Sequence, residues 1–266
     1  MTVTILTAAG TWSSWDAGYP ADVARTLTSD FDDIHAEVFG LDGPRFRWQP
    51  IGYPAVGFLV PDPHTSYRES RAAGINEAVL LGRRANGPVA LIGYSQGADV
   101  VVRAADLLHA QGVPVVAVIT FGSPCRRPGA TLIGNDPGGS GISRYYGDEA
   151  LWPITFDYTL PGDMYSNAPD DTFLPEFYDL LIDMELSLPF ATSVLRFIGR
   201  LFEPGGSDAD ALQRRLSLEP RRVARTVQVV TEFLSTNAHV AYHIPRPEFG
   251  GRSAVAHAAD VLDGLV

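Results

Sequence analysis

Short apolar runs alternate with segments of helical periodicity along this chain. Three strand-like runs cover residues 3–7, 88–92 and 114–121, and each ends near a glycine or another small residue. Their nearly continuous hydrophobicity is typical of strands buried on both faces of a parallel sheet. Between them, apolar positions recur at helical spacing over residues 67–83 and 98–108. This alternation predicts an α/β fold with a doubly wound parallel sheet.

The second half of the chain has a less regular pattern. A strand-like run at residues 154–158 precedes a long helical region at 173–202, which we expect to break near Pro189. Further helices are expected at about 221–234 and 254–265. The region 173–202 is unusually apolar for a segment outside the sheet. We therefore expect either a lid or acyl-chain groove, or a small helical core that packs on the sheet.

The sequence Gly93-Tyr94-Ser95-Gln96-Gly97 lies between a strand-like run and a helical segment. A Gly-x-Ser-x-Gly sequence in this setting predicts a nucleophile elbow, a sharp strand-to-helix turn that exposes the serine hydroxyl. The glycines let two chain segments approach closely, and the N-terminus of the next helix points at the reaction centre. Ser95 is therefore the candidate nucleophile, although an ordinary tight turn also explains these residues.

Composition restricts what can activate this serine. All 20 basic residues are arginine, so a Ser–Lys dyad, a phosphate-loop lysine and a Schiff-base lysine are excluded. The base must then be a histidine or a carboxylate. The net charge of −11 argues against nucleic acid or an anionic lipid surface as a partner. No apolar stretch is long enough for an integral membrane segment, and no secretory signal is evident at the N-terminus.

The single cysteine, Cys125, excludes an intrachain disulfide and a cysteine-based zinc cluster. Beside Pro124 and Arg126 it is either a small residue that closes a strand or a low-pKa thiol. Neither possibility requires a metal, and no metal or organic cofactor is expected.

Three histidines, His239, His243 and His257, follow Ser95 at a distance suitable for a base. This agrees with the order serine, acid, histidine found in α/β-hydrolases. His257 lies within the last helical pattern, where we expect it to pack or face solvent. The four-residue spacing of His239 and His243 can also hold a metal on a helix face. We favour His239 as the base because His243 lies closer to a rigid Pro-Arg-Pro segment.

The best candidate for the acid is Asp163, in the turn sequence that follows the strand-like run at 154–158. Asp157, Asp170 and Asp171 are alternatives, and the last two resemble carboxylates at a helix N-terminus. An acid loop that leaves the edge of a sheet is where α/β-hydrolases carry this residue.

The oxyanion hole is expected to use the backbone N–H of Gln96, the residue after the nucleophile. A second N–H comes from a loop after an early strand, for which Thr11 is the best candidate because its hydroxyl can add a third donor. An ordinary strand-end turn also explains Gly10-Thr11.

Several separate stretches, taken in chain order, carry a resemblance to a known family. They are Gly10-Thr11, Arg47 to Ala55, Gly93 to Gly97, Phe121 to Pro124, Gly162 to Tyr165, and His239 with Tyr242 and Pro245. Together they resemble the mycobacteriophage lysin B proteins within the cutinase-like α/β-hydrolases, over nearly the whole chain. Residues 48–55 and 163–165 are the more diagnostic because generic hydrolases need neither.

The resemblance implies that Ser95 is the nucleophile, Asp163 the orienting acid and His239 the base. It also implies a phage lysis protein, a serine esterase that cleaves the bond between mycolic acids and arabinogalactan in the host cell envelope. We then expect a single α/β-hydrolase domain over residues 1–266. It would carry a helical insertion at about 167–236, between acid and histidine, and no separate peptidoglycan-binding domain.

On this resemblance the protein is made in the host cytoplasm without a signal peptide and released at lysis. We expect it to act as a monomer on mycolyl-arabinogalactan or another lipid ester. One alternative is a cutinase-like lipase or polyesterase of broad acyl specificity, although secreted cutinases rely on disulfides that this chain cannot form. Another is a non-catalytic envelope-binding protein on the same scaffold.

Overall fold

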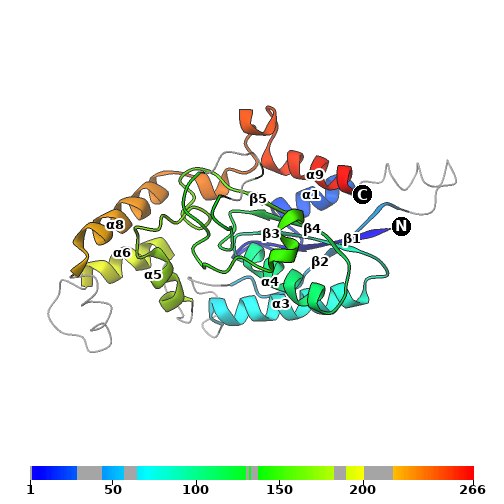
Figure 1. The fold of residues 1–266 in the computed structure, drawn as a ribbon, viewed down its shortest axis with the longest axis horizontal. Helices are drawn as coiled ribbons and strands as arrows, with labels where there is room; N and C mark the ends of the chain where they lie inside the picture. The colour runs from blue at the N-terminus through cyan, green and yellow to red at the C-terminus, as the bar shows by residue number, and fades with distance from the viewer. Residues whose placement is uncertain are drawn as a thin grey trace.

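The computed structural model describes residues 2–28, 44–56, 65–129, 132, 137–182, 190–200 and 218–266. Within them, five strands form one sheet in the order β2-β1-β3-β4-β5. The strands are β1 (Val3–Ala8), β2 (Phe46–Pro50), β3 (Val89–Tyr94), β4 (Val115–Phe121) and β5 (Thr155–Tyr158). Every neighbouring pair is parallel, so the prediction of a doubly wound parallel sheet is confirmed (Figure 1).

Helices cover both faces of this sheet (Figure 1). They are α1 (Tyr19–Leu27) and α9 (Ala254–Leu265) on one face, and α3 (Tyr67–Arg84) and α4 (Gln96–Ala110) on the other. Alternate residues of β3 divide the two cores. Ala90 and Ile92 pack with α1 and α9, whereas Val89 and Leu91 pack with α3 and α4. A strand that must be apolar on both faces explains the continuous hydrophobic run in the sequence.

Side-chain caps fix where two of these helices begin. Ser66 Oγ accepts a hydrogen bond from the Glu69 N–H, and the Glu69 carboxylate accepts one from the Ser66 N–H, which starts α3. Ser253 Oγ accepts from the Ala256 N–H and starts α9. The helices expected at 67–83 and 254–265 therefore match α3 and α9 to within one residue.

The hydrophobic pattern did not predict β2, α1 or the short 3-10 helix η1 (Glu149–Ile154). β2 is an edge strand in which only Phe46 is fully buried, so its alternating sequence contains no apolar run. Its position is fixed instead by parallel pairing with β1 and by the Trp48 Nε1–H, which donates to Thr7 Oγ1 at 2.8 Å.

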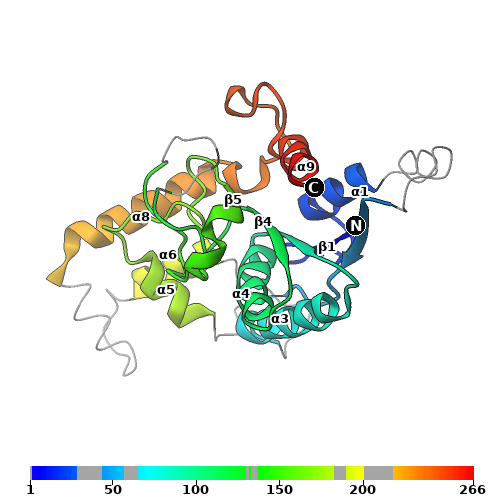
Figure 2. The ribbon, with the colours of Figure 1, turned by 45° about the vertical axis from the view of Figure 1, so that its right-hand side comes forward.

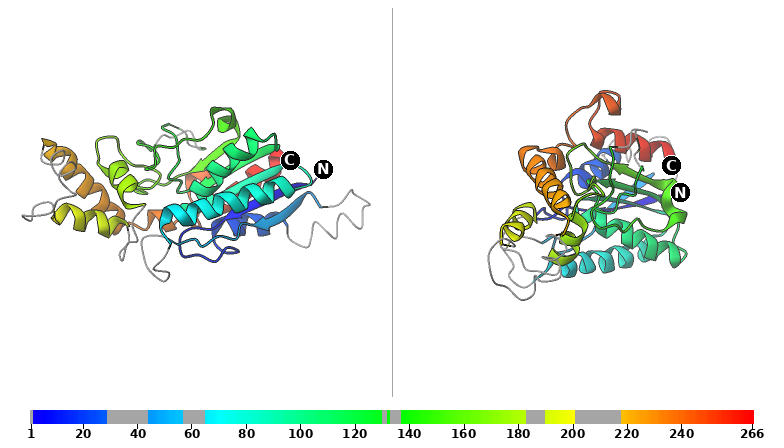
Figure 3. Two further views of the ribbon diagram at one scale, coloured as in Figure 1. Left: turned by 90° about the horizontal axis from the view of Figure 1, so that it is seen from below. Right: turned by 60° about the vertical axis from the view of Figure 1, so that its left-hand side comes forward.

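Three helices, α5 (Leu174–Leu181), α6 (Phe190–Arg200) and α8 (Pro220–Ser235), lie together beyond the carboxyl ends of the strands (Figures 2 and 3). They enclose a separate apolar cluster that includes Phe173, Phe177, Val194, Ile198 and Val230. The described part of 173–202 thus forms a small helical core. The expected break near Pro189 lies outside the described residues. No helix in the ranges given above is long and apolar enough to span a bilayer.

The strand order places the loops after β1 and β3 at the point where the chain direction reverses across the sheet. The chain leaves β1 toward α1 on one face and leaves β3 toward α4 on the other. In open parallel sheets, the crevice between two such diverging loops is the usual ligand site. Thr11 and Trp12 after β1 and Ser95 after β3 do line one cavity.

Candidate active site

Ser95 lies in a strained turn between β3 and α4. Its backbone φ is +54°, in the left-handed region that residues other than glycine rarely adopt. The turn also needs glycine on both sides. A Cβ at Gly97 would overlap the carbonyl oxygens of Ala8 and Ala9, and one at Gly93 would overlap the Gly97 carbonyl. A strained strand-to-helix turn of this kind is the geometry of a nucleophile elbow. An ordinary tight turn does not require a serine with positive φ.

Ser95, His239 and Asp163 form a continuous hydrogen-bonded relay. The Nε2 of His239 lies 2.9 Å from the Oγ of Ser95, and its Nδ1 lies 2.9 Å from the Oδ2 of Asp163. An ionised carboxylate can only accept, so Nδ1–H donates to Asp163 and Nε2 is left to accept the serine proton. Ser95 follows β3, Asp163 follows β5, and His239 lies in η2 (Ala238–Val240). Their order along the chain is therefore serine, acid, histidine. The structure thus brings together the three residues that the sequence favoured.

Asp163 is fully buried and is held in its ionised form by several donors. Burial raises the pKa of Asp163. The charge and hydrogen bond of His239, together with the hydrogen bonds from the Tyr242 hydroxyl and the Tyr165 N–H, outweigh burial and lower this pKa below its ordinary value. The Tyr242 hydroxyl donates to Oδ2 at 2.7 Å, and the Tyr165 N–H donates to Oδ1 at 3.1 Å. A carboxylate kept ionised here fixes both the tautomer and the orientation of the imidazole.

The imidazole of His239 is packed between aromatic rings. The ring centroids of Tyr165 and Tyr94 lie 4.7 Å and 5.1 Å from that of His239, and the Tyr94 hydroxyl donates to the His239 carbonyl at 2.8 Å. Gly122, with φ +57°, lies directly against the His–Asp pair. A Cβ there would be 2.8 Å from Asp163 Oδ2 and 2.9 Å from His239 Nδ1. The relay therefore depends on a glycine at position 122.

The candidate oxyanion donors lie at the same end of the sheet as Ser95. Gln96 is the first residue of α4, and N–H groups in a first helical turn have no acceptor within the helix. The Gln96 side chain is held away from them: its Nε2 donates to the Val56 carbonyl at 2.9 Å, and its Oε1 accepts from Ser70 Oγ at 3.2 Å. Thr11 lines the cavity that Ser95 faces. The donor roles of Gln96 and Thr11 stay predictions.

The other two candidate histidines have different partners. His243 is exposed and stacks on Tyr19, with ring centroids 6.2 Å apart. His257 packs in α9, where its Nδ1 lies 2.9 Å from the Tyr158 hydroxyl. His239 and His243 therefore do not converge on a common point, as a metal pair would. Within the described ranges, no group of three or more His, Cys, Asp or Glu residues could hold a metal ion.

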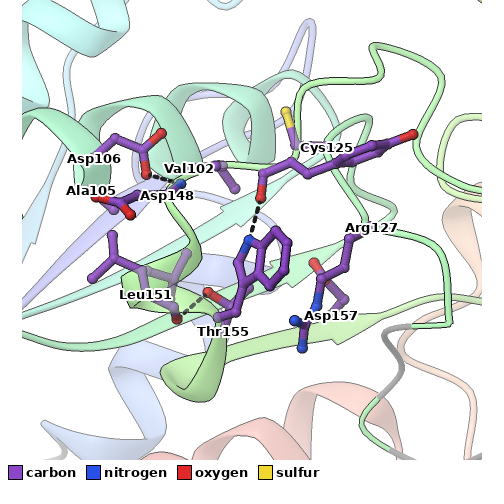
Figure 4. Close-up of a pocket in the computed structure, with 13 residues that line it drawn as sticks. Val102, Ala105, Asp106, Cys125, Arg127, Asp148, Leu151, Thr155 and Asp157 are labelled. Carbon is purple, nitrogen blue, oxygen red and sulfur yellow. Dashed lines mark hydrogen bonds between the residues drawn. The ribbon is translucent and has the colours of Figure 1, made fainter.

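The alternative acids lie away from the imidazole. Asp157 accepts from Thr120 Oγ1 at 2.5 Å, and burial raises its pKa. Asp157 and Cys125 line a small pocket of about 10 Å³, which has room for about one water molecule (Figure 4). Asp170 and Asp171 lie in the turn before α5.

Burial raises the pKa of the Cys125 thiol well above its ordinary value, so the interpretation of Cys125 as a low-pKa thiol is wrong.

A buried charge cluster that the sequence did not predict lies one helical turn after Ser95. Asp99 Oδ2 is 2.8 Å from Arg71 Nη1, and Asp99 Oδ1 is 2.6 Å from Arg103 Nε. The Tyr178 hydroxyl donates to Oδ2 at 2.8 Å. Burial raises the pKa of Asp99, but the two guanidinium charges outweigh it and lower the pKa. Because Tyr178 belongs to α5, the cluster fastens the inserted helices to α3 and α4.

Arg126 is a second unpredicted residue that shapes the site. Its buried guanidinium donates from Nε to the Ser166 carbonyl at 2.6 Å, and from Nη2 to the Gly138 and Gly139 carbonyls at 2.7 and 2.8 Å. Ser166 lies in the loop that carries Asp163. Arg126 therefore ties this acid loop to a second loop, a contact between distant segments that no local pattern announces.

Ser95 and His239 open into a cavity of about 240 Å³. The remaining lining residues are mostly aromatic or aliphatic: Thr11, Trp12, Tyr67, Tyr94, Pro124, Tyr165, Phe233 and Val240. A concave apolar surface with a few convergent polar groups is typical of sites for small organic ligands. The relay therefore faces an apolar chamber without charged walls among its described lining residues.

Solved structures with a similar arrangement include esterases. The catalytic core domain of acetyl xylan esterase from Trichoderma reesei aligns with 68% of this chain and 96% of its own, at 19% identity and a TM-score of 0.47. An iodinated complex of acetyl xylan esterase aligns with 72% and 97%, at 18% identity and a TM-score of 0.41. An extracellular α/β-hydrolase from a Paenibacillus species aligns with 89% and 74%, at 12% identity and a TM-score of 0.33.

The chain matches no protein-family model and no curated protein. The distant likenesses to solved structures carry no argument about activity or substrate. The fold class follows instead from the chain's own five parallel strands, the helices on both faces and the elbow at Ser95. These features confirm the expected α/β-hydrolase fold with a doubly wound parallel sheet, whereas the cutinase-like type rests on the resemblance.

Proposed function

We propose that this protein is a serine carboxylic ester hydrolase. The observation that carries the proposal is the relay from Ser95 through His239 to Asp163, with both hydrogen bonds at 2.9 Å, on a strained elbow that faces an apolar cavity. A serine hydroxyl becomes a useful nucleophile when an oriented imidazole takes its proton. The relay itself needs no metal or organic cofactor.

In the proposed reaction, Ser95 Oγ forms a bond to the ester carbonyl carbon while His239 Nε2 accepts the hydroxyl proton. The carbonyl electrons move to oxygen, where the N–H groups of Gln96 and Thr11 stabilise the negative charge. The C–O bond to the alcohol then breaks, and His239 returns its proton to the departing oxygen. A water molecule attacks the acyl-enzyme by the same route and releases the carboxylic acid and free Ser95.

The proposed substrate is a lipid ester, and more finely the ester between mycolic acid and arabinogalactan. Two things support this choice: the resemblance of segments 47–55 and 162–165 to lysin B proteins, and the apolar walls around Ser95. The net charge of −11 favours apolar rather than electrostatic engagement with an envelope. Four further parts of the proposal rest on the resemblance and the sequence alone. They are the lysis role, release at lysis, the monomeric state and the single domain over 1–266.

One observation favours the alternative of a cutinase-like esterase of broad acyl specificity. A cavity of about 240 Å³ is far too small to enclose a long-chain lipid, and a short acyl group fits it entirely. Hydrolysis of short nitrophenyl esters does not separate the two proposals. Release of free mycolic acids from purified mycolyl-arabinogalactan does.

The test has two parts. A fluorophosphonate should label the wild-type protein covalently and leave Ser95→Ala unlabelled; no labelling of either would mean that the protein is a binding module and would overturn the ester hydrolase. The mycolate-release assay then compares wild type, Ser95→Ala and His239→Ala. Release by the wild type alone supports the mycolyl esterase, whereas hydrolysis of simple esters without any mycolate release supports the alternative.

A further inference from the structure

Two exposed apolar residues stand at the open side of the cavity that Ser95 faces. Trp12, in the loop after β1, is 50% exposed, and Val240, next to His239, is 51% exposed. A single exposed apolar side chain is ordinary, but apolar surface gathered beside a reaction centre is typical of a ligand-binding groove. A bound substrate chain would cover these two residues.

The backbone holds Trp12 in place at a conformational cost. Its φ is +63°, a left-handed conformation that is rare for bulky residues, and its N–H donates to the Ala55 carbonyl at 2.6 Å. Ala55 itself has φ +50°. Two such residues, paired by one hydrogen bond, fix the indole beside the cavity, and strain of this kind concentrates at ligand-binding positions.

Val240 is fixed by a hydrogen bond from the first residue of α1, the helix that follows the Trp12 loop. Its carbonyl accepts a hydrogen bond from the Tyr19 hydroxyl at 2.6 Å, and it lies in η2 together with His239. Trp12 and Val240 thus reach the cavity from two segments that lie far apart in the chain. Tyr67, Tyr94 and Tyr165 also line this cavity, and Tyr67 is buried.

We propose that this cavity binds the acyl chain of the ester, and that Trp12 and Val240 form a lip over which a longer chain leaves the protein. This inference rests on the proposed ester hydrolysis and adds the position and length of the bound acyl group. A cavity of about 240 Å³ holds a short acyl chain, on the order of eight carbons, and no long one. Carbons beyond that number lie on the indole of Trp12 instead of inside the cavity.

The proposal predicts a break in the dependence of rate on acyl length. For p-nitrophenyl esters of constant leaving group, each added methylene should raise kcat/KM by up to about fourfold until about eight carbons, because each is removed from water. Further methylenes, which contact only one apolar surface, should add less. A continuous rise to twelve carbons, or a maximum at acetyl, would contradict the proposal.

Trp12→Ala tests the lip, and Trp15→Ala is the matched control. Trp15 lies in the same loop, is 52% exposed and does not line the cavity. The measured quantity is the ratio of kcat/KM for dodecanoyl over butanoyl ester, which cancels any general loss of active protein. We expect Trp12→Ala to lower this ratio about tenfold, the effect of losing roughly 55 Å² of apolar contact. Trp15→Ala should leave it unchanged.

Equal ratios in Trp12→Ala and the wild type would overturn the proposal, as would an equal fall in Trp15→Ala. A length dependence on the alcohol side, measured with acetates of longer alcohols, would overturn the acyl assignment. Calorimetric titration of Ser95→Ala with dodecanoic acid needs no turnover. If the wild type hydrolyses no ester, but dodecanoic acid binds Ser95→Ala and binds more weakly once Trp12→Ala is added, ester hydrolysis is refuted and the cavity assignment stands. If dodecanoic acid does not bind Ser95→Ala at all, the cavity assignment is refuted.

Discussion

Gly122→Ala is the sharpest test of the relay, because the added methyl group would clash with both Asp163 and His239. Gly122 follows β4, and a Cβ at this position would lie 2.8 Å from Asp163 Oδ2 and 2.9 Å from both Nδ1 and Cε1 of His239. Real Cβ atoms essentially never come within 3.0 Å of such neighbours. The hydrogen-bonded pair or the turn after β4 must therefore shift.

The expected effects on stability and on catalysis differ in size. An alanine at φ +57° costs about 1–2 kcal/mol of stability from backbone strain alone. A displacement of the imidazole or carboxylate by a few tenths of an ångström to about 1 Å disturbs both relay hydrogen bonds. Misplacement on this scale lowers rates about 100-fold, and loss of the correct His–Asp arrangement lowers them about 10,000-fold. We therefore expect Gly122→Ala to lower kcat by a factor between about 100 and about 10,000.

The assay pairs ester hydrolysis with thermal unfolding, and Gly250→Ala supplies the control. Gly250 has φ +64°, close to that of Gly122, and a Cβ there would meet nothing within 4 Å. It should therefore show the same backbone strain without the clash. Labelling of Ser95 by a fluorophosphonate should slow in Gly122→Ala and proceed normally in Gly250→Ala.

A result that would refute this reasoning is easily recognised. If Gly122→Ala keeps the wild-type kcat while its melting temperature falls no further than that of Gly250→Ala, the His239–Asp163 contact is not needed in the observed geometry. The same outcome would refute the role of Asp163 in the proposed mechanism.

Three further predictions concern buried hydroxyl and carboxyl groups. Tyr242→Phe removes one hydrogen-bond donor from the buried Asp163 carboxylate. We expect the free energy of unfolding, measured in urea, to fall by about 1.5–3 kcal/mol and kcat to fall by at most about tenfold. Unchanged values in both assays would contradict this prediction. Tyr178→Phe removes a donor from Asp99, and it should lower the melting temperature and speed proteolysis near α5, whereas unaltered cleavage would show that the contact does not hold the helix. The pKa of Asp99 is lowered in the folded state, so its stabilisation is present above the ordinary carboxyl pKa and is lost as pH falls from about 4. Urea unfolding across this range should show less pH dependence in Asp99→Asn, and equal slopes would argue against the paired carboxylate.

The fold was predictable where hydrophobicity is decided locally. β3 and β4 are covered on both faces, so nearly every residue is apolar and the run is visible in the sequence. β2 shows the limit of this signal. It lies at the edge of the sheet and owes its place to pairing with β1, a contact between segments far apart in the chain. An edge strand this short has no pattern strong enough to predict it.

The candidate site divides in the same way. Ser95 was predictable because the elbow is a local sequence, whereas His239 and Asp163 were selected by chain order and resemblance among several candidates. The structure places both within hydrogen-bond distance of their expected neighbours. Tyr242 and Arg126 could not have been given their contacts in advance, because each depends on how two distant loops meet.

The buried cluster around Asp99 connects these local and distant parts. Asp99 lies on the helix that Ser95 begins, one turn further on, and receives the Tyr178 hydroxyl from α5. The ring of Tyr67 packs edge-on against Tyr178, with centroids 5.8 Å apart, and also forms a wall of the cavity. The helix that presents the nucleophile and the wall that bounds its substrate are therefore fastened to one carboxylate. A shift of α5 would therefore move that wall relative to Ser95, and α8 lies closer still, because the ring centroid of Phe233 is 6.2 Å from that of His239.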